Sequence, residues 1–176
     1  MDYRCNKFLP AFAPLDKEFS LGNHLHDNFP DYFSFYPCLH NAKNQLCKLD
    51  DIIISTFSDP SAYIVISDVS IKNHIATSVL HVHSFNQLII KTYHQAVNMS
   101  TTEAKLSAIR CGINQTISIL YIKHIVVITD SLHTTIKIFD SSSHPYQIHS
   151  AAITCELREF FNKYINNHIE FCNCHM

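Results

Sequence analysis

Apolar and polar positions along this chain become regular only after the turn Asp59-Pro60-Ser61. Three short runs follow, at residues 62–68, 75–83 and 86–93, and their alternating or β-branched composition predicts an antiparallel meander of strands. A fourth run, residues 125–129, is apolar almost throughout and predicts a buried central strand. It ends at Asp130, which would place a carboxylate at the carboxyl edge of a sheet, where open α/β folds carry their chemistry.

Helical periodicity appears between and after these runs. Ser100 with Glu103 three residues later is the pattern of a capping box, and it predicts that a helix begins there. An apolar stripe at spacings of three or four continues this helix: Leu106, Ile109, Ile113, Ile117 and Leu120. Shorter helices are predicted at residues 132–139 and 145–164, and a last strand at residues 169–172. The predicted order is β-β-β-α-β-α-α-β.

Residues 1–59 are predicted to be an N-terminal extension or connector, and residues 60–176 the main domain. Four prolines interrupt the first part, at positions 10, 14, 30 and 37. Eight aromatic residues between Phe8 and Tyr36 are too many for a free tail, so we expect this segment to dock on the domain or on a protein partner. A short helix is predicted at residues 45–57.

Composition narrows the class of protein. Hydrophobic residues make up 47% and charged residues 16% of 176 residues, which is typical of a globular fold. The net charge of −2 gives no strong basic surface for nucleic acid. We expect an intracellular protein of nucleus or cytoplasm, because no signal-peptide pattern or membrane-length apolar run is present. The seven cysteines follow no disulfide-scaffold spacing.

Three acidic motifs occur in a fixed order. Asp68 lies in Ser67-Asp68-Val69-Ser70, Glu103 opens the capped helix, and Asp130 lies in Thr129-Asp130-Ser131. In this order and on these elements, the motifs resemble those of ribonuclease H domains attached to the reverse transcriptases of retrotransposons. The resemblance covers about residues 60–173, with Val69 in place of the family's glycine.

The resemblance implies a ribonuclease H-like α/β fold: a mixed five-stranded sheet, three antiparallel strands then parallel ones, flanked by helices. It implies that Asp68, Glu103 and Asp130 hold two Mg²⁺ ions, which Mn²⁺ would replace, and hydrolyse the RNA strand of RNA–DNA hybrids. Hard cations of this kind require oxygen ligands. Ser70 and Ser131 are the expected substrate-binding residues.

The resemblance also implies a fourth carboxylate on a helix beyond the last strand, and no residue of this sequence matches it. We therefore expect a domain that lacks its final helix and whose nuclease activity is impaired. The alternative is a catalytically inactive ribonuclease H-like remnant that acts as a nucleic-acid-binding or protein-interaction module. Taken singly, each acid also has a structural interpretation: Glu103 and Asp130 as helix-capping residues, and Asp68 as a turn residue.

Several His and Cys residues have spacings that zinc ligands sometimes show. They are the pairs His24/His26, Cys38/His40 and His81/His83, and the group Cys172/Cys174/His175. None completes a four-ligand set at the usual intervals, so the sequence favours structural roles for them. A half-exposed sheet face is the better explanation for His81 and His83.

Overall fold

The structure is a computed structural model and describes residues 33–36, 43–84, 87–119, 121–140, 144–163 and 166–174. Its elements are, in chain order, β1 (Phe33–Tyr36), α2 (Lys43–Ser58), β2 (Ala62–Lys72), β3 (Ile75–Ser84), β4 (Gln87–Val97), α3 (Thr101–Ile117), β5 (His124–Thr129), α4 (Leu132–Phe139), α5 (Gln147–Lys163) and β6 (His168–Asn173). Every strand and helix predicted from the sequence is present, with ends that move by a few residues. No described helix is long and apolar enough to cross a membrane.

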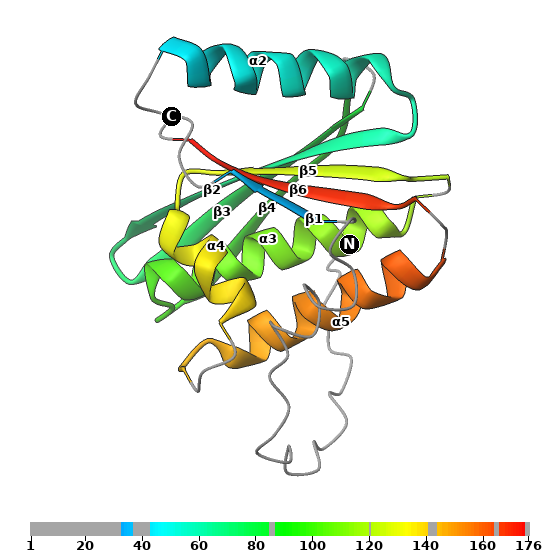
Figure 1. Cartoon of the computed structure of the whole chain (residues 1–176). Coiled ribbons are helices and arrows are strands. Elements are labelled where there is room, and N and C mark those ends of the chain that lie inside the picture. Colours follow the sequence, from blue (N-terminus) through cyan, green and yellow to red (C-terminus); the bar gives the residue numbers. More distant parts are fainter. Residues whose placement is uncertain are drawn as a thin grey trace.

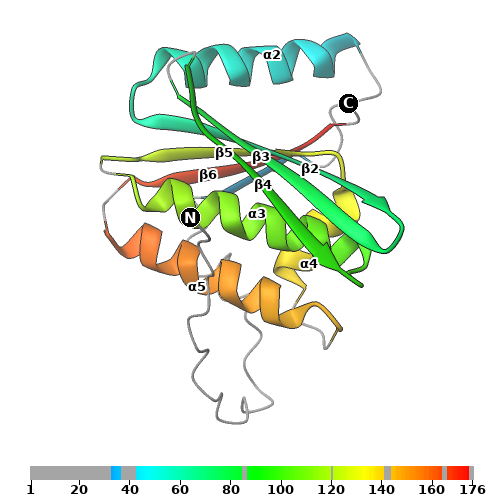
Figure 2. The ribbon, with the colours of Figure 1, turned by 180° about the vertical axis from the view of Figure 1, so that it is seen from behind.

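One sheet of six strands, in the order β1-β6-β5-β2-β3-β4, organises the molecule. Strands β2, β3 and β4 form the predicted antiparallel meander, whereas β2, β5, β6 and β1 run parallel (Figures 1 and 2). The prediction of five strands was wrong by one. The additional strand, β1, is four residues long and lies among prolines, so its pattern was too short to be recognised.

Helices cover both faces of this sheet. Helix α2 lies alone on one face, and α3, α4 and α5 lie on the other (Figures 1 and 2). The larger hydrophobic core lies under the second group and contains Leu106, Ile109, Val127, Leu157 and Phe171, all fully buried. The apolar stripe predicted for the helix after Ser100 therefore packs on the sheet as expected.

A smaller core lies between the sheet and α2. Ile64, Val126 and Ile128 are buried there, and Ile52 and Phe57 of α2 pack against them. Two parts of the segment predicted as an extension, β1 and α2, thus belong to the sheet and to its cover. The remaining aromatic residues of that segment lie outside the described ranges.

The tight turn between β2 and β3 has a local cause. Asn73 and His74 both have positive φ, at 51° and 62°, as a two-residue type I′ hairpin requires. Asparagine tolerates this conformation better than most residues. The hairpin fixes the register that pairs Asp68 with Val79, and it continues without a shift from Ile64 to Lys72.

Candidate metal-binding carboxylates at the sheet edge

Asp68 and Asp130 lie side by side on neighbouring parallel strands. The last register pair between β2 and β5 joins Ser67 to Thr129, and each aspartate is the next residue of its strand. Asp68 is exposed, and its carboxylate accepts a hydrogen bond from the Val69 N–H at 2.7 Å. Asp130 directly follows the end of β5, with its side chain 30% exposed. The apolar run before Asp130 therefore does what the sequence predicted, whereas β2 continues to Lys72, beyond Asp68.

Glu103 reaches this region from a helix. The hydroxyl of Ser100 accepts a hydrogen bond from the Glu103 N–H at 3.2 Å, which confirms the predicted N-cap of α3. This cap fixes Glu103 in the first helical turn, where the partial positive charge of the helix terminus stabilises a carboxylate.

The three acids approach the edge from different faces of the sheet. Alternation along β2 puts Asp68 on the face of Ile64 and Ile66, which pack toward α2. Glu103 begins α3 on the opposite face. Among the residues that the structure describes, these three acids do not form a group whose ligand atoms all lie within 4.8 Å of one another. Their assignment as metal ligands remains a prediction.

A lysine that the sequence analysis assigned no role lies between two of these acids. Lys105, two residues after Glu103 on α3, places its Nζ 2.5 Å from Oδ1 of Asp130. The lysine side chain is only 12% exposed, so this ion pair is shielded from solvent on the lysine side. The pair neutralises Asp130 with a cation that belongs to the protein.

The expected substrate-binding serines lie in different environments. Ser70 is exposed on β2, opposite Thr77 of β3. Ser131 is the N-cap of α4: its hydroxyl accepts hydrogen bonds from the Thr134 N–H at 3.2 Å and the Thr134 hydroxyl at 2.7 Å. It is Ser131, rather than Asp130, that caps this helix. Its role toward a substrate remains a prediction.

A pocket opens between α3 and the meander. Small, mostly apolar side chains such as Ala104 line it, together with the polar residues Ser78 of β3, Gln95 of β4 and Ser107 of α3, and its volume is about 290 Å³. Because Ala104 directly follows Glu103, the pocket begins next to the candidate carboxylates.

The His and Cys residues considered as alternative zinc ligands lie in different parts of the structure. Cys172 and Cys174 are buried in the core beneath α2, and burial, together with the nearby Asp130, raises the pKa of the Cys174 thiol. The rings of His81 and His83 lie 6.0 Å apart on β3. His175 and the pairs His24/His26 and Cys38/His40 lie outside the described residues.

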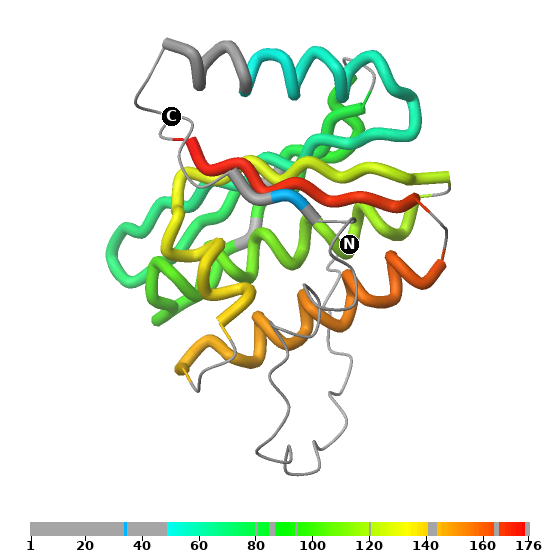
Figure 3. Tube along the Cα trace, viewed as in Figure 1, coloured from blue at the N-terminus to red at the C-terminus, as the bar shows by residue number. Residues whose placement is uncertain are grey.

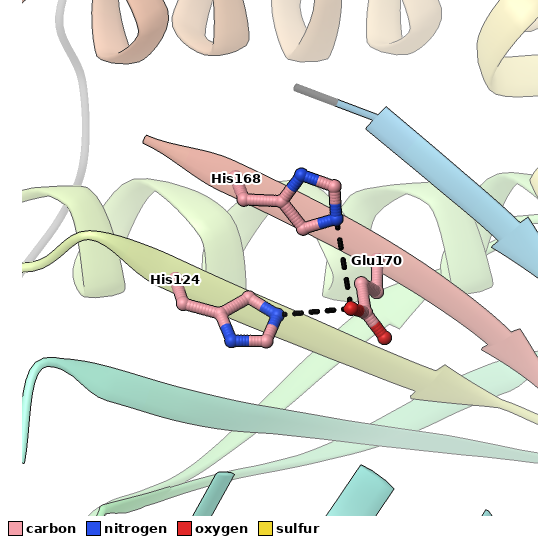
Figure 4. Close-up of side chains that lie close together, drawn as sticks. All are labelled: His124, His168 and Glu170. Atoms are coloured by element: carbon pink, nitrogen blue, oxygen red, sulfur yellow. Dashed lines mark ion pairs between the residues drawn. The ribbon is translucent and has the colours of Figure 1, made fainter. Parts of the chain in front are cut away.

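A second polar cluster, which the sequence analysis did not recognise, lies at the opposite end of β5. It consists of His124 at the start of β5 and of His168 and Glu170 on β6 (Figure 4). Burial by itself would raise the pKa of the Glu170 carboxyl, but the nearby imidazoles of His124 and His168 outweigh burial and lower this pKa to about 2.

Comparison with known proteins gives a fold-level result only. No family model matches the chain, and no curated protein matches it in sequence. Solved structures with a similar fold include ribonuclease H1 of the archaeon Halobacterium salinarum, with 9% identity, a TM-score of 0.49 and coverage of 64% of this chain and 85% of that one. The N-terminal RNase H domain of rv2228c from Mycobacterium tuberculosis has 9% identity and a TM-score of 0.48, covering 65% and 81%.

The protease–reverse transcriptase of prototype foamy virus is also similar, with 16% identity and a TM-score of 0.48 over 64% of this chain and 18% of that one. These likenesses are weak. The fold class is instead evident from the sheet itself: an antiparallel meander continued by parallel strands and flanked by helices, as expected for a ribonuclease H-like fold.

Proposed function

We propose that this chain is a ribonuclease H-type nuclease domain derived from a mobile element, which hydrolyses the RNA strand of RNA–DNA hybrids with impaired efficiency. The observation that carries the proposal is the position of Asp68 and Asp130. They directly follow a register pair of neighbouring parallel strands, and Glu103 occupies the capped first turn of the next helix. This is the order of acids that the motif resemblance implies.

The donor set suits Mg²⁺, since carboxylate oxygens are the side-chain ligands that this ion prefers. Asp68, Glu103 and Asp130 would hold it, and Mn²⁺ would serve in its place. When bound, the metal supplies an activated water and stabilises the departing 3′ oxygen of the phosphodiester. The protein's own contribution is positioning: strand pairing fixes the two aspartates, and the Ser100 cap fixes Glu103.

The neighbouring surface is suited to a nucleic-acid strand. Ser70 is exposed two residues beyond Asp68 on the α2 face, and the pocket that contains Ser78, Gln95 and Ser107 lies on the opposite face, beside α3. Polar side chains in such positions are able to contact ribose hydroxyls, which distinguish RNA from DNA. The net charge of −2 makes this binding weaker than that of a basic nuclease.

The missing fourth carboxylate would impair this site, and Lys105 would add to the impairment. Its ammonium group lies 2.5 Å from Asp130 and competes with any metal for that carboxylate. The same contact favours a second candidate function, a non-catalytic ribonuclease H-like module that binds nucleic acid without cleaving it. In that case the ion pair replaces the metal and preserves the fold.

Cleavage of a labelled RNA–DNA hybrid by the purified protein distinguishes the two candidates. The assay is run in Mg²⁺ and then Mn²⁺, beside Asp130→Asn. Asp140→Asn is the matched control, because Asp140 also pairs with a lysine, Lys137, but lies at the far end of α4. Loss of cutting only in Asp130→Asn supports the nuclease. Hybrid binding without cutting by the folded protein supports the second candidate. A folded protein that does not bind and does not cut the hybrid would contradict both candidates.

A further inference from the structure

The cluster of His124, His168 and Glu170 is assembled by strand pairing. Parallel strands β5 and β6 pair His124 directly with His168, and Glu170 lies two residues farther along β6. Residues two apart on a strand point to the same face. This is the α2 face. Val126 lies two residues after His124 and Cys172 two residues after Glu170, and both pack in the core beneath α2. Three potential metal ligands from two strands thus project from one face.

The distances within the cluster fit a metal better than they fit hydrogen bonds. Oε1 of Glu170 lies 3.4 Å from Nε2 of His124 and 3.5 Å from Nε2 of His168. Good hydrogen bonds between such atoms measure about 2.7–3.2 Å. In a tetrahedral zinc site, bonds of about 2.0–2.1 Å separate neighbouring ligand atoms by about 3.3–3.4 Å. Each of the three side chains offers one ligand atom, and these three atoms lie within 4.8 Å of one another.

Burial and unused polar atoms point in the same direction. The side chains are 24%, 28% and 15% exposed for His124, His168 and Glu170, so the cluster is shielded but reachable from solvent. Nε2 of His124 and Oε2 of Glu170 are buried and lack a hydrogen-bond partner among the described residues. Unsatisfied buried polar atoms are costly, and a bound cation would satisfy them.

A third strand contributes a neighbouring hydroxyl. Ser34 of β1 is paired in register with Glu170, and its Oγ lies 3.1 Å from Nε2 of His168. Coordination through Nε2 would replace this hydrogen bond and leave the hydroxyl beside the fourth ligand position. A water in that position would complete the tetrahedron and would have Ser34 as its partner.

From this geometry we propose that His124, His168 and Glu170 form a zinc-binding site at the amino end of the parallel strands. Two imidazole nitrogens and one carboxylate oxygen are a donor set that zinc uses, with water as the fourth ligand. The site is separate from the candidate nuclease carboxylates. Asp130 directly follows the six residues of β5 that begin with His124, which separates the two sites by about 20 Å at 3.3 Å per residue.

The test is metal titration of the full-length, chelator-treated protein. Co²⁺ is added first, because its tetrahedral complexes give a characteristic visible absorption, and Zn²⁺ then competes for the site. Variants His168→Gln and Glu170→Gln are compared with His133→Gln, which changes an exposed histidine of α4. We expect one equivalent of metal in the unmodified protein, no thiolate charge-transfer band, and at least a tenfold loss of affinity in the two cluster variants.

Two results would overturn the proposal. The first is the absence of stoichiometric binding by the unmodified protein. The second is equal binding by His133→Gln and by the cluster variants, or a thiolate band, either of which would assign the metal to other residues. Circular dichroism of each metal-free variant shows whether it folds. If His168→Gln does not fold, Glu170→Gln, which keeps the shape of the side chain, decides the question.

Discussion

A carboxylate lies at each end of strand β5, Asp130 directly after it and Glu170 on the neighbouring strand β6, and the protein pairs these two carboxylates in different ways. At the carboxyl end, Asp130 is bound by the Lys105 ammonium group, on a side chain that is 12% exposed. At the amino end, where β5 and β6 lie side by side (Figure 3), Glu170 faces the imidazoles of His124 and His168 (Figure 4), which are 24% and 28% exposed. One end has a lysine ammonium group, and the other has imidazoles, which are common metal ligands.

This difference indicates which end of β5 is suited to a metal ion. A lysine ammonium carries its charge at every physiological pH and has no lone pair, so it competes with a metal ion. A neutral imidazole has a lone pair and acts as a ligand beside the carboxylate. Asp130, one of the three acids recognised by motif, therefore meets a competing cation, whereas the cluster that no motif revealed has the better metal geometry.

The largest predicted effect tests whether the two ends act independently. Asp130→Asn should lower cleavage of the RNA strand of a hybrid by more than about 100-fold, because a direct metal ligand is lost. Glu170→Gln should leave the cleavage rate unchanged. Initial rates with a labelled hybrid measure both effects, with Zn²⁺ binding to the same variants measured in parallel. Zinc affinity that falls in Asp130→Asn would contradict the separation of the sites.

The sequence predicted the fold well where local pattern and packing agree. The apolar run before Asp130 and the Ser100 cap of α3 are local features, and both appear as predicted. The strand Phe33–Tyr36 was missed because four residues carry too little periodicity, and its place beside β6 depends on tertiary pairing.

The candidate site was predicted less completely. Asp68, Glu103 and Asp130 were found because each lies in a short motif, but the Lys105–Asp130 contact depends on how α3 packs on the sheet. His124 and His168 are distant in sequence, and only the parallel register of β5 and β6 makes them neighbours. Ligand spacing along the chain carries no information about such a pair.

The second prediction concerns the stability conferred by the amino-end cluster. Zn²⁺ at 100 times its dissociation constant should raise the free energy of unfolding by about 2.7 kcal/mol, since it binds the folded state alone. For a chain of this size this corresponds to roughly 5–10 °C in Tm. Differential scanning calorimetry with and without a chelator measures the shift, and His168→Gln should remove it. A shift of the same size in that variant would show that other ligands are responsible.

The third prediction concerns the built-in cation at the carboxyl end. Lys105→Met keeps most of the side-chain volume but removes the charge that competes for Asp130. Mg²⁺ should then bind more tightly by about fivefold, close to 1 kcal/mol, which is the range of a partly exposed ion pair. Calorimetric titration with Mg²⁺ measures this, and Lys137→Met, which breaks the pair with Asp140, is the matched control. Unchanged Mg²⁺ affinity would mean that Lys105 does not compete with the metal.

The smallest predicted effect uses His83, a histidine on the same sheet face as the zinc cluster that packs near Phe57 and His81. Burial, and then the nearby His81, lower the pKa of His83 below its usual 6.5. The unfolded chain therefore binds more protons than the folded one just below pH 6.5. The stabilising contribution is fully present above that pH and is lost as the pH falls through the folded-state pKa.

Urea unfolding at pH 7.5 and pH 5.5, with a chelator present, should therefore show a loss of stability on acidification that is smaller in His83→Gln. The exposed His133 serves as the comparison, since His133→Gln should retain the full loss. An identical pH dependence in His83→Gln would assign the acid sensitivity to other groups. If it is smaller, burial and the neighbouring His81 make His83 acid-sensitive without a carboxylate, and the special feature of His124 and His168 is the carboxylate of Glu170 beside them.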